Sequence, residues 1–149
     1  MPDDTVTDQS LSLKLFVVLS KAYKTVMEKA SRDAKNYELS PSEFGVLEVL
    51  YTKGSIPLQQ IGDKILITSG TMTYNIDKLA KKGLLKRVPC ADDRRVVFAE
   101  LTKAGTALFD RIFPSHAATI HAMMNGLDDE QKRQAIELLK LIGKGARSN

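Results

Sequence analysis

The stretch from Ile56 to Thr102 restricts the possible folds of this chain more than any other part of the sequence. It begins with two short amphipathic patterns, over residues 56–65 and 68–82, which flank a break at Leu66-Ile67. Apolar residues recur in each pattern at intervals of three or four, as they do on one face of a helix. In the second pattern the apolar stripe is narrow, and the other positions are mostly small, hydroxylated or basic. We therefore predict two short helices joined by a turn.

Two strand-like segments, residues 84–88 and 96–101, follow these helices, and the loop 89–95 between them is polar and charged. Such a loop is longer than a tight hairpin needs, so we expect it to project as a wing. The order helix, turn, helix, hairpin predicts a winged helix-turn-helix, in which the second helix can enter the major groove of duplex DNA. The expected fold is mainly α-helical with a small β-hairpin wing.

Positive charge gathers on the same part of the chain. Residues 64–95 carry eight Lys or Arg and three Asp or Glu, a net charge of +5, whereas residues 1–63 carry −2 and residues 96–149 carry +1. Phosphate binding requires such a concentration of cations on one surface. An ordinary solvated surface can also be basic, so it is the motif and the charge together that favour DNA binding.

Long helices are expected on both sides of this module. Residues 9–36 are apolar over most of the helix circumference, which indicates burial on more than one side and, in a small domain, against a second subunit. Thr102 opens another helix, which runs to about Asn125 with a kink at Pro114, and Asp128 opens the last one. Because the last helix is also amphipathic, we predict a homodimer.

Ser40-Pro41-Ser42-Glu43 is a start signal for the first helix of the central module, which should end near Gly54. Ile56-Pro57 should begin the short helix that follows. The expected organisation is an N-terminal dimerisation helix (1–38), a winged helix-turn-helix DNA-binding module (39–101), and a linker helix with a C-terminal dimerisation helix (102–149), all in one intertwined domain.

Residues that can hydrogen-bond phosphates or base edges lie on the second helix of the motif and on the hairpin. Asn75 should lean toward the core, Asp77 should pair with Lys81, and Asp93 should brace Arg95, whose guanidinium suits a narrow minor groove. The predicted DNA-binding set is Thr68, Ser69, Gly70, Thr71, Thr73, Tyr74, Lys78, Lys82, Lys86, Arg87, Asp93, Arg94 and Arg95.

No residue set in the chain supports an enzyme. We find no phosphate-binding Gly-rich loop, no paired carboxylates on a shared face and no Ser/His/Asp set. His116 and His121 are five residues apart, which separates them around a helix and argues against a metal pair. We therefore expect no catalytic residues, no metal and no cofactor. Cys90, in the wing, is either an incidental thiol or a redox sensor.

A single cysteine fits a reducing compartment, and the acidic, polar start of the chain does not resemble a signal peptide. The longest apolar run, residues 15–19, is too short to cross a bilayer. We therefore expect a cytoplasmic protein with no membrane partner.

Two segments resemble the MarR family of bacterial transcription regulators. LQQIGDKILITSGTMTYNIDKLAKKGLLKR is similar to the helix-turn-helix of that family, and DDRRVVFAELTKAG is similar to its wing signature of Asp-x-Arg, an apolar strand and Leu-Thr-x-x-Gly. The resemblance implies a triangular homodimer on double-stranded DNA, with one recognition helix of each subunit in a major groove. It also implies that Asp93 and Arg95 take the wing roles, with Arg95 in the minor groove.

The resemblance further implies that a small phenolic or other lipophilic ligand binds between the dimer helices and the DNA-binding module and loosens the DNA. Candidate pocket residues in this sequence are Phe16, Leu19, Tyr23 and His116. Some family members sense peroxide through a cysteine in the first helix, but this chain has none there. SLKLFVVLSKAYK and PLQQIGDKI resemble a Gram-positive branch that responds to quinones and aromatic compounds.

These observations predict a repressor that leaves a pseudo-palindromic operator when an aromatic, phenolic or quinone-like effector binds. Two alternatives stay open. One is a thiol switch, in which Cys90 rather than a ligand controls DNA release. The other is a winged helix that serves only as a protein-interaction module.

Overall fold

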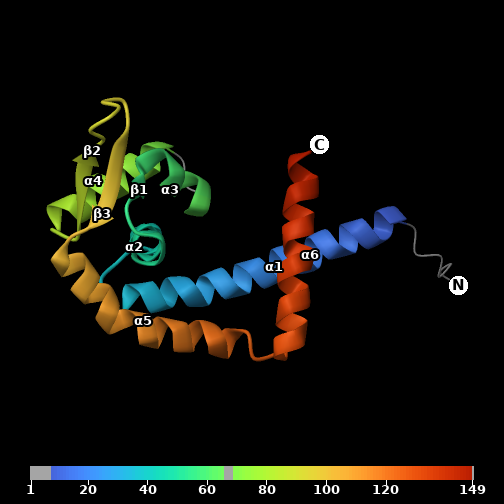
Figure 1. Cartoon of the computed structure of the whole chain (residues 1–149). Helices are drawn as coiled ribbons and strands as arrows, with labels where there is room; N and C mark the ends of the chain where they lie inside the picture. The colour runs from blue at the N-terminus through green and yellow to red at the C-terminus, as the bar shows by residue number, and fades with distance from the viewer. Residues whose placement is uncertain (1–7, 66–68, 149) are drawn as a thin grey trace, which may run out of the picture. The chain divides into compact units, whose positions relative to one another are not determined.

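The computed structural model describes residues 8–65 and 69–148, and it confirms the mainly α-helical fold with a small antiparallel sheet (Figure 1). The elements of these described ranges are, in chain order, α1 (Asp8–Lys35), α2 (Pro41–Lys53), β1 (Ile56–Pro57), α3 (Leu58–Ile65), α4 (Ser69–Lys81), β2 (Leu85–Pro89), β3 (Val97–Leu101), α5 (Lys103–Met123) and α6 (Asp129–Arg147). By its contacts the chain divides into two units, Met1–Phe113 and Pro114–Asn149.

The first unit has one hydrophobic core, which joins α2, α3, α4, the sheet and the first part of α5. Helix α2 lies at its centre and buries Val46, Leu47 and Leu50 almost completely. The apolar stripe predicted for α4 is confirmed, because Ile76 and Leu79 are fully buried and Met72 packs partly buried against the same core. The residues with no exposed surface are Val46, Leu47, Ile61, Ile76, Leu79, Ala99 and Phe109.

The predicted boundaries of α2 are confirmed by its caps. The Ser40 hydroxyl accepts from the Glu43 amide, and the Glu43 carboxylate accepts from the Ser40 amide, both at 3.1 Å. Pro41 occupies the first turn, where its missing amide hydrogen leaves no gap in the helix. Gly54 ends the helix with a φ of 79°, a conformation that side chains disfavour.

The sheet has three strands in the order β1-β3-β2, whereas the sequence predicted a two-stranded hairpin. The expectation that Ile56-Pro57 begins the short helix is wrong: both residues pair with β3, Ile56 opposite Ala99 and Pro57 opposite Phe98. Pro57 fits this place because an edge strand can spare one amide hydrogen. The extra strand ties the start of α3 to the wing.

The junction of the wing with α5 is closed by tight backbone contacts. The Thr102 amide donates to the Leu84 carbonyl at 3.1 Å, and its hydroxyl donates to the Gly83 carbonyl at 2.6 Å. The same hydroxyl accepts from the Gly105 amide at 3.1 Å, which confirms Thr102 as the helix cap. A Cβ on Gly105 would lie 2.0 Å from the Leu84 carbonyl oxygen, so a side chain does not fit there.

In the second unit, α6 opens with the predicted cap, in which Asp128 and Gln131 exchange hydrogen bonds at 2.8 and 3.0 Å. No residue of α6 is buried within the chain. Its large apolar side chains are exposed, as are many of α1 in the first unit. They are Ile136, Leu138, Leu139 and Leu141 in α6 and Leu11, Leu13, Leu15, Phe16, Val17 and Val18 in α1. None of the described helices is long and apolar enough to cross a membrane.

Candidate nucleic-acid interface

Helix α4 presents the hydroxyl-bearing and aromatic side chains that the sequence predicted. Thr71 and Thr73 are exposed, and Tyr74 keeps 64% of its surface accessible. Ser69 and Gly70 form the start of the helix, while Thr68 lies outside the described residues. The exposed part of α4 therefore has the size and polarity to meet base edges and phosphates in a groove.

The opposite face of α4 belongs to the core. Ile76 and Leu79 are fully buried, and Asn75 is only 4% exposed, which confirms that Asn75 leans toward the core. The Asn75 Nδ2 atom has no hydrogen-bond partner among the described residues. This burial removes Asn75 from the surface that α4 can offer to a partner.

Asp77 pairs with Arg87 of β2, so the expected pairing with Lys81 is wrong. Strand β2 runs beside α4 and brings the Arg87 guanidinium to the Asp77 carboxylate. A pair four residues apart on one helix contributes only about 0.2–0.5 kcal/mol, so a tertiary partner in good geometry can replace it. The pair attaches the middle of α4 to the wing.

Several predicted phosphate partners have carboxylate partners within the chain. Lys82 Nζ lies 2.8 Å from Glu43 Oε2, and Lys78 Nζ lies 3.4 Å from Glu43 Oε1. Lys86 lies 3.2 Å from Glu100 on the neighbouring strand. Between 35% and 58% of each lysine side chain stays exposed, so these amines border the surface of α4 and the wing.

Glu43 is the residue of this interface that the sequence analysis missed. It was expected only to cap α2, because Lys78 and Lys82 lie more than thirty residues further along the chain. Burial by itself would raise the pKa of Glu43, but hydrogen bonds from Lys82 and Ser40 outweigh it, and the pKa is lowered from its ordinary value. The carboxylate is therefore charged at neutral pH.

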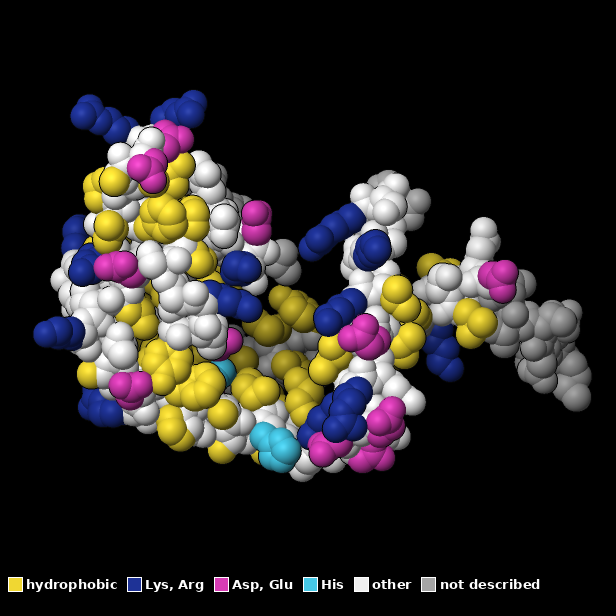
Figure 2. Space-filling model, in the orientation of Figure 1, with side chains coloured by type: hydrophobic (Ala, Val, Ile, Leu, Met, Phe, Trp, Pro, Cys, Tyr) yellow, Lys and Arg dark blue, Asp and Glu magenta, His cyan; other side chains and the backbone are white. Residues whose placement is uncertain are grey.

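Arg94 and Arg95 lie on a turn at the wing tip that Asp93 stabilises. Figure 2 shows Lys or Arg side chains extending from the upper end of the first unit, where Figure 1 draws the wing. The predicted brace is confirmed: Asp93 accepts from the Arg95 amide at 3.0 Å, from Nε at 3.1 Å and from Nη2 at 3.3 Å. These hydrogen bonds lower the pKa of Asp93. The Arg95 side chain is still 91% exposed, so its guanidinium is oriented and accessible at once.

Cys90 lies at the base of the wing and is half-buried, with a free thiol. Its amide donates to the Val96 carbonyl at 3.0 Å, and the Val96 amide donates to the Asp93 carbonyl at 3.0 Å. Cys90 is thus joined through the loop backbone to the turn that presents Arg95. Among the described residues no group of three His, Cys, Asp or Glu side chains is arranged to hold a metal ion.

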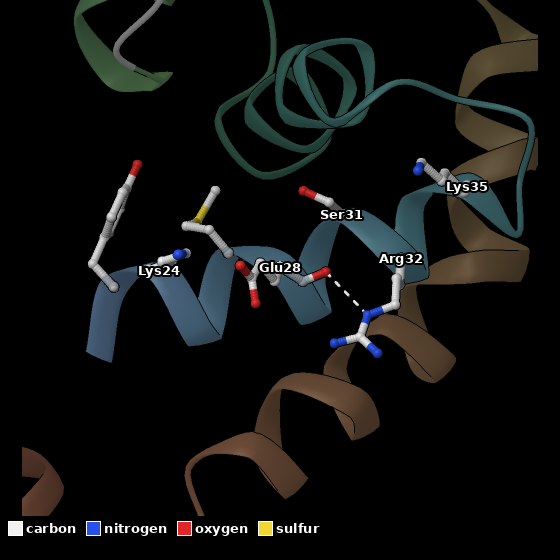
Figure 3. Close-up of a pocket in the computed structure, with 7 residues that line it drawn as sticks. Lys24, Glu28, Ser31, Arg32 and Lys35 are labelled. Atoms are coloured by element: carbon white, nitrogen blue, oxygen red, sulfur yellow. Dashed lines mark hydrogen bonds between the residues drawn. The ribbon is translucent and has the colours of Figure 1, made fainter. Parts of the chain in front are cut away.

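Two of the candidate pocket residues, Phe16 and Tyr23, line separate hollows on α1. Tyr23 contributes to a hollow of about 600 Å³ along α1, whose other lining residues are Lys24, Met27, Glu28, Ser31, Arg32 and Lys35 (Figure 3). Phe16 lines a different hollow nearer the start of α1, together with Leu13 and Ser12. Leu19 is half-buried, and His116, in the second unit, is buried.

Comparison with known proteins agrees with this geometry. A family model described as the MarR family matches residues 39–97. The HTH-type transcriptional regulator MhqR of Bacillus subtilis (strain 168) is 48% identical over 136 residues, which cover 91% of this chain and 94% of MhqR. Relatives of this kind are transcription regulators and not enzymes.

Solved structures show the same fold. The MarR family regulator Sco3205 from Streptomyces coelicolor, in complex with DNA, has a TM-score of 0.82 at 19% identity and covers 94% of this chain and 92% of its own. BpsR from Bordetella bronchiseptica, whose DNA binding is regulated by 6-hydroxynicotinic acid, has a TM-score of 0.76 at 23% identity, with coverages of 87% and 98%. This chain belongs to the MarR family and is a transcription regulator with a DNA-binding winged helix.

Proposed function

We propose that the protein is a homodimeric repressor that binds a pseudo-palindromic DNA site and is released by a small aromatic effector. The main support is the combination, on one module, of the exposed polar face of α4 with the oriented arginine of the wing. These two features match the major groove and the neighbouring minor groove of one DNA half-site.

The residues divide into two roles in this proposal. Thr73 and Tyr74 read base edges in the major groove, and Arg95 enters the minor groove. Residues that bind phosphates position the module without reading sequence. Those residues are Thr68, Ser69, Gly70, Thr71, Lys78, Lys82, Lys86, Arg87 and Arg94, while Asp93 orients Arg95.

The homodimer is supported by the exposed apolar side chains of α1 and α6. Leu13, Phe16 and Leu141 each keep more than 60% of their surface accessible within the chain. Such side chains are enriched at interfaces between subunits, where their burial drives association. Two-fold symmetry of the protein then requires two symmetric half-sites in the DNA.

An aromatic effector is supported by the regulation of BpsR by 6-hydroxynicotinic acid and by the partly apolar hollow that Tyr23 and Met27 line on α1. We propose that Phe16, Leu19, Tyr23 and His116 contribute to an effector pocket completed in the dimer. We also place the regulator in the cytoplasm, where bacterial DNA is found.

The test is a DNA-binding titration by fluorescence anisotropy, with random-sequence duplexes at several salt concentrations. A DNA-binding module should show log K falling linearly with log salt, with a slope of about −0.9 for each phosphate contacted. An interaction module that does not bind DNA should show no binding at any salt concentration.

The effector is tested by adding 6-hydroxynicotinic acid or p-benzoquinone to the complex with a DNA duplex that the protein has selected. Release of the wild-type protein and of Cys90→Ser to the same extent supports a bound ligand as the signal. If p-benzoquinone releases the wild-type protein and leaves Cys90→Ser on the DNA, the signal is the thiol and the ligand-controlled repressor is wrong.

A further inference from the structure

Glu43 is the most deeply buried charged side chain among the described residues of the DNA-binding module. The residue is 1% exposed and its side chain 2%, although it lies in the first turn of α2, where Pro41 is exposed and Ser42 half-buried. A charge at this depth is stable only when it is fully paired and hydrogen-bonded. The partners of Glu43 therefore indicate the structural role of its charge.

Two of these partners come from the C-terminal end of α4 and the turn just after it. Lys82 Nζ is 2.8 Å from Glu43 Oε2, and Lys78 Nζ is 3.4 Å from Oε1. Lys82 also donates to the Glu38 carbonyl at 3.4 Å, in the turn between α1 and α2. The start of α2 is thus attached to the helix that presents the DNA-contacting surface.

The contacts of Glu43 continue to the exposed face of α4 through Lys78. Lys78 Nζ lies 5.9 Å from the centre of the Tyr74 ring, within the range of a cation–π contact. One ammonium group therefore lies between a buried carboxylate and an aromatic ring that is 64% exposed. Movement of Lys78 would remove a restraint on the Tyr74 ring.

The ion pair of Asp77 with Arg87 attaches α4 to β2 from a different direction. Asp77 and Lys78 are adjacent, so the middle of α4 is connected both to the wing and to the start of α2. Because direct readout depends on the geometry of each side chain against a base edge, restraints of this kind affect specificity as well as affinity.

We propose that Glu43 is a positioning residue for sequence readout: its buried carboxylate holds Lys78 and Lys82 and thereby fixes the orientation of the α4 surface around Tyr74. This inference rests on the proposed role of α4 in reading DNA. Glu43 itself touches no DNA. It also balances part of the charge of two lysines, which limits their attraction to phosphates of any sequence.

The test compares Glu43→Gln with the wild-type full-length protein. The probes are a duplex that the wild-type protein has selected from a random pool and a scrambled duplex of the same composition. Glutamine can still accept the Ser40 amide hydrogen, so the cap of α2 is kept while the charge is lost.

The ratio of the affinities for the selected and the scrambled duplex should fall by about tenfold in Glu43→Gln, which is the discrimination of one base contact. The salt slope on the scrambled duplex should become steeper, because Lys78 and Lys82 lose the carboxylate that offsets part of their charge.

Glu100→Gln is the matched control, because it removes one carboxylate from the same module and frees Lys86 from an exposed ion pair. It should strengthen binding to both duplexes alike and keep their ratio. An equal fall of the ratio in Glu43→Gln and Glu100→Gln would attribute the effect to net charge and overturn the positioning role.

The double variant Glu43→Gln with Lys82→Gln keeps the wild-type net charge and removes the buried carboxylate of Glu43. This variant tests the positioning role of Glu43 if circular dichroism shows that Glu43→Gln alone does not fold. A lowered ratio in this variant supports the role of Glu43. A wild-type ratio, or loss of the fold in both variants, overturns it. If the wild-type protein enriches no duplex, the result contradicts the proposed function itself and not only the role of Glu43.

Discussion

Arg95 extends into solvent from the tip of the wing, yet two hydrogen bonds to Asp93 restrict the position of its guanidinium. A side chain held in this way loses less conformational entropy when it enters a groove. Asp93 and Arg95 are two residues apart, so their contact could be predicted from the sequence. The wing is therefore oriented before DNA arrives.

Arg95→Ala should weaken binding to a selected duplex by about 1–3 kcal/mol, because one groove contact is lost. Asp93→Ala should weaken it less, because Arg95 remains but is no longer oriented. The double variant should bind as weakly as Arg95→Ala alone, since Asp93 acts only through Arg95. Anisotropy titrations of the three variants measure this coupling, and strictly additive losses would contradict it.

Gly105→Ala should destabilise the protein by several kcal/mol, because the added Cβ would lie 2.0 Å from the Leu84 carbonyl oxygen. Gly45→Ala is the control: its Cβ would lie 3.6 Å from an Ile65 side-chain carbon, an ordinary contact, and alanine favours the helix. Urea unfolding gives both free energies of unfolding. Equal stability of the two variants would show that the junction can relax.

Other contacts of single residues could not be predicted from the sequence. Asp77 pairs with Arg87 and Glu43 with Lys82 only because α4 packs against both β2 and α2. Local patterns, such as the capping box at Ser40, are determined by a few neighbouring residues. Pairs between distant segments depend on the packed fold, so sequence spacing does not reveal them.

Among the elements, the helices with caps were predicted most accurately. The start of α2 at Pro41 and of α6 at Asp129 follow from capping boxes that the sequence shows directly. Strand β1 was missed because two residues carry no periodicity and because Pro57 suggests a helix start. Its strand character comes from pairing with β3, which is a tertiary contact.

The attachment of α2 to α4 should depend on pH. Burial alone would raise the pKa of Glu43, but its pairing lowers the pKa below the ordinary value. The charged carboxylate therefore stabilises the fold above the ordinary glutamate pKa of about 4.3. This contribution is lost as the pH falls through the lower pKa of the folded state. The free energy of unfolding of Glu43→Gln should therefore fall less than that of the wild type between about pH 5 and pH 3.

Urea unfolding at several pH values measures the difference. Asp93, whose pKa is also lowered, is present in both proteins, so the comparison isolates Glu43. Parallel pH profiles for the two proteins would show that Glu43 contributes no acid sensitivity.

At the scale of the whole molecule, the exposed leucines of α6 should form part of the dimer interface. Leu138→Gln with Leu141→Gln should shift the protein toward the monomer, because each buried leucine contributes about 1.5–3 kcal/mol. Lys140→Gln with Arg147→Gln changes two exposed residues on the other side of the same helix and should leave the dimer intact. Sedimentation equilibrium measures the monomer–dimer equilibrium of both variants. A stable dimer of the leucine variant would place the interface elsewhere.

The fold class and the DNA-binding module could be predicted because the helix-turn-helix and the wing form one continuous pattern, which agrees with the segregation of charge. The effector pocket stays a prediction. Phe16 and Tyr23 share a helix in the sequence, but they line different hollows within the chain. A pocket depends on which side chains converge from several segments, and periodicity does not contain that information.

Selection of duplexes from a random-sequence pool by the wild-type protein tests the central claim most directly. A dimer that inserts one α4 helix per subunit should enrich two inverted half-sites whose centres lie about 10–10.5 base pairs, one helical turn, apart. An asymmetric consensus, or a pool that remains random after repeated rounds, would contradict the claim that this surface reads DNA as a symmetric pair.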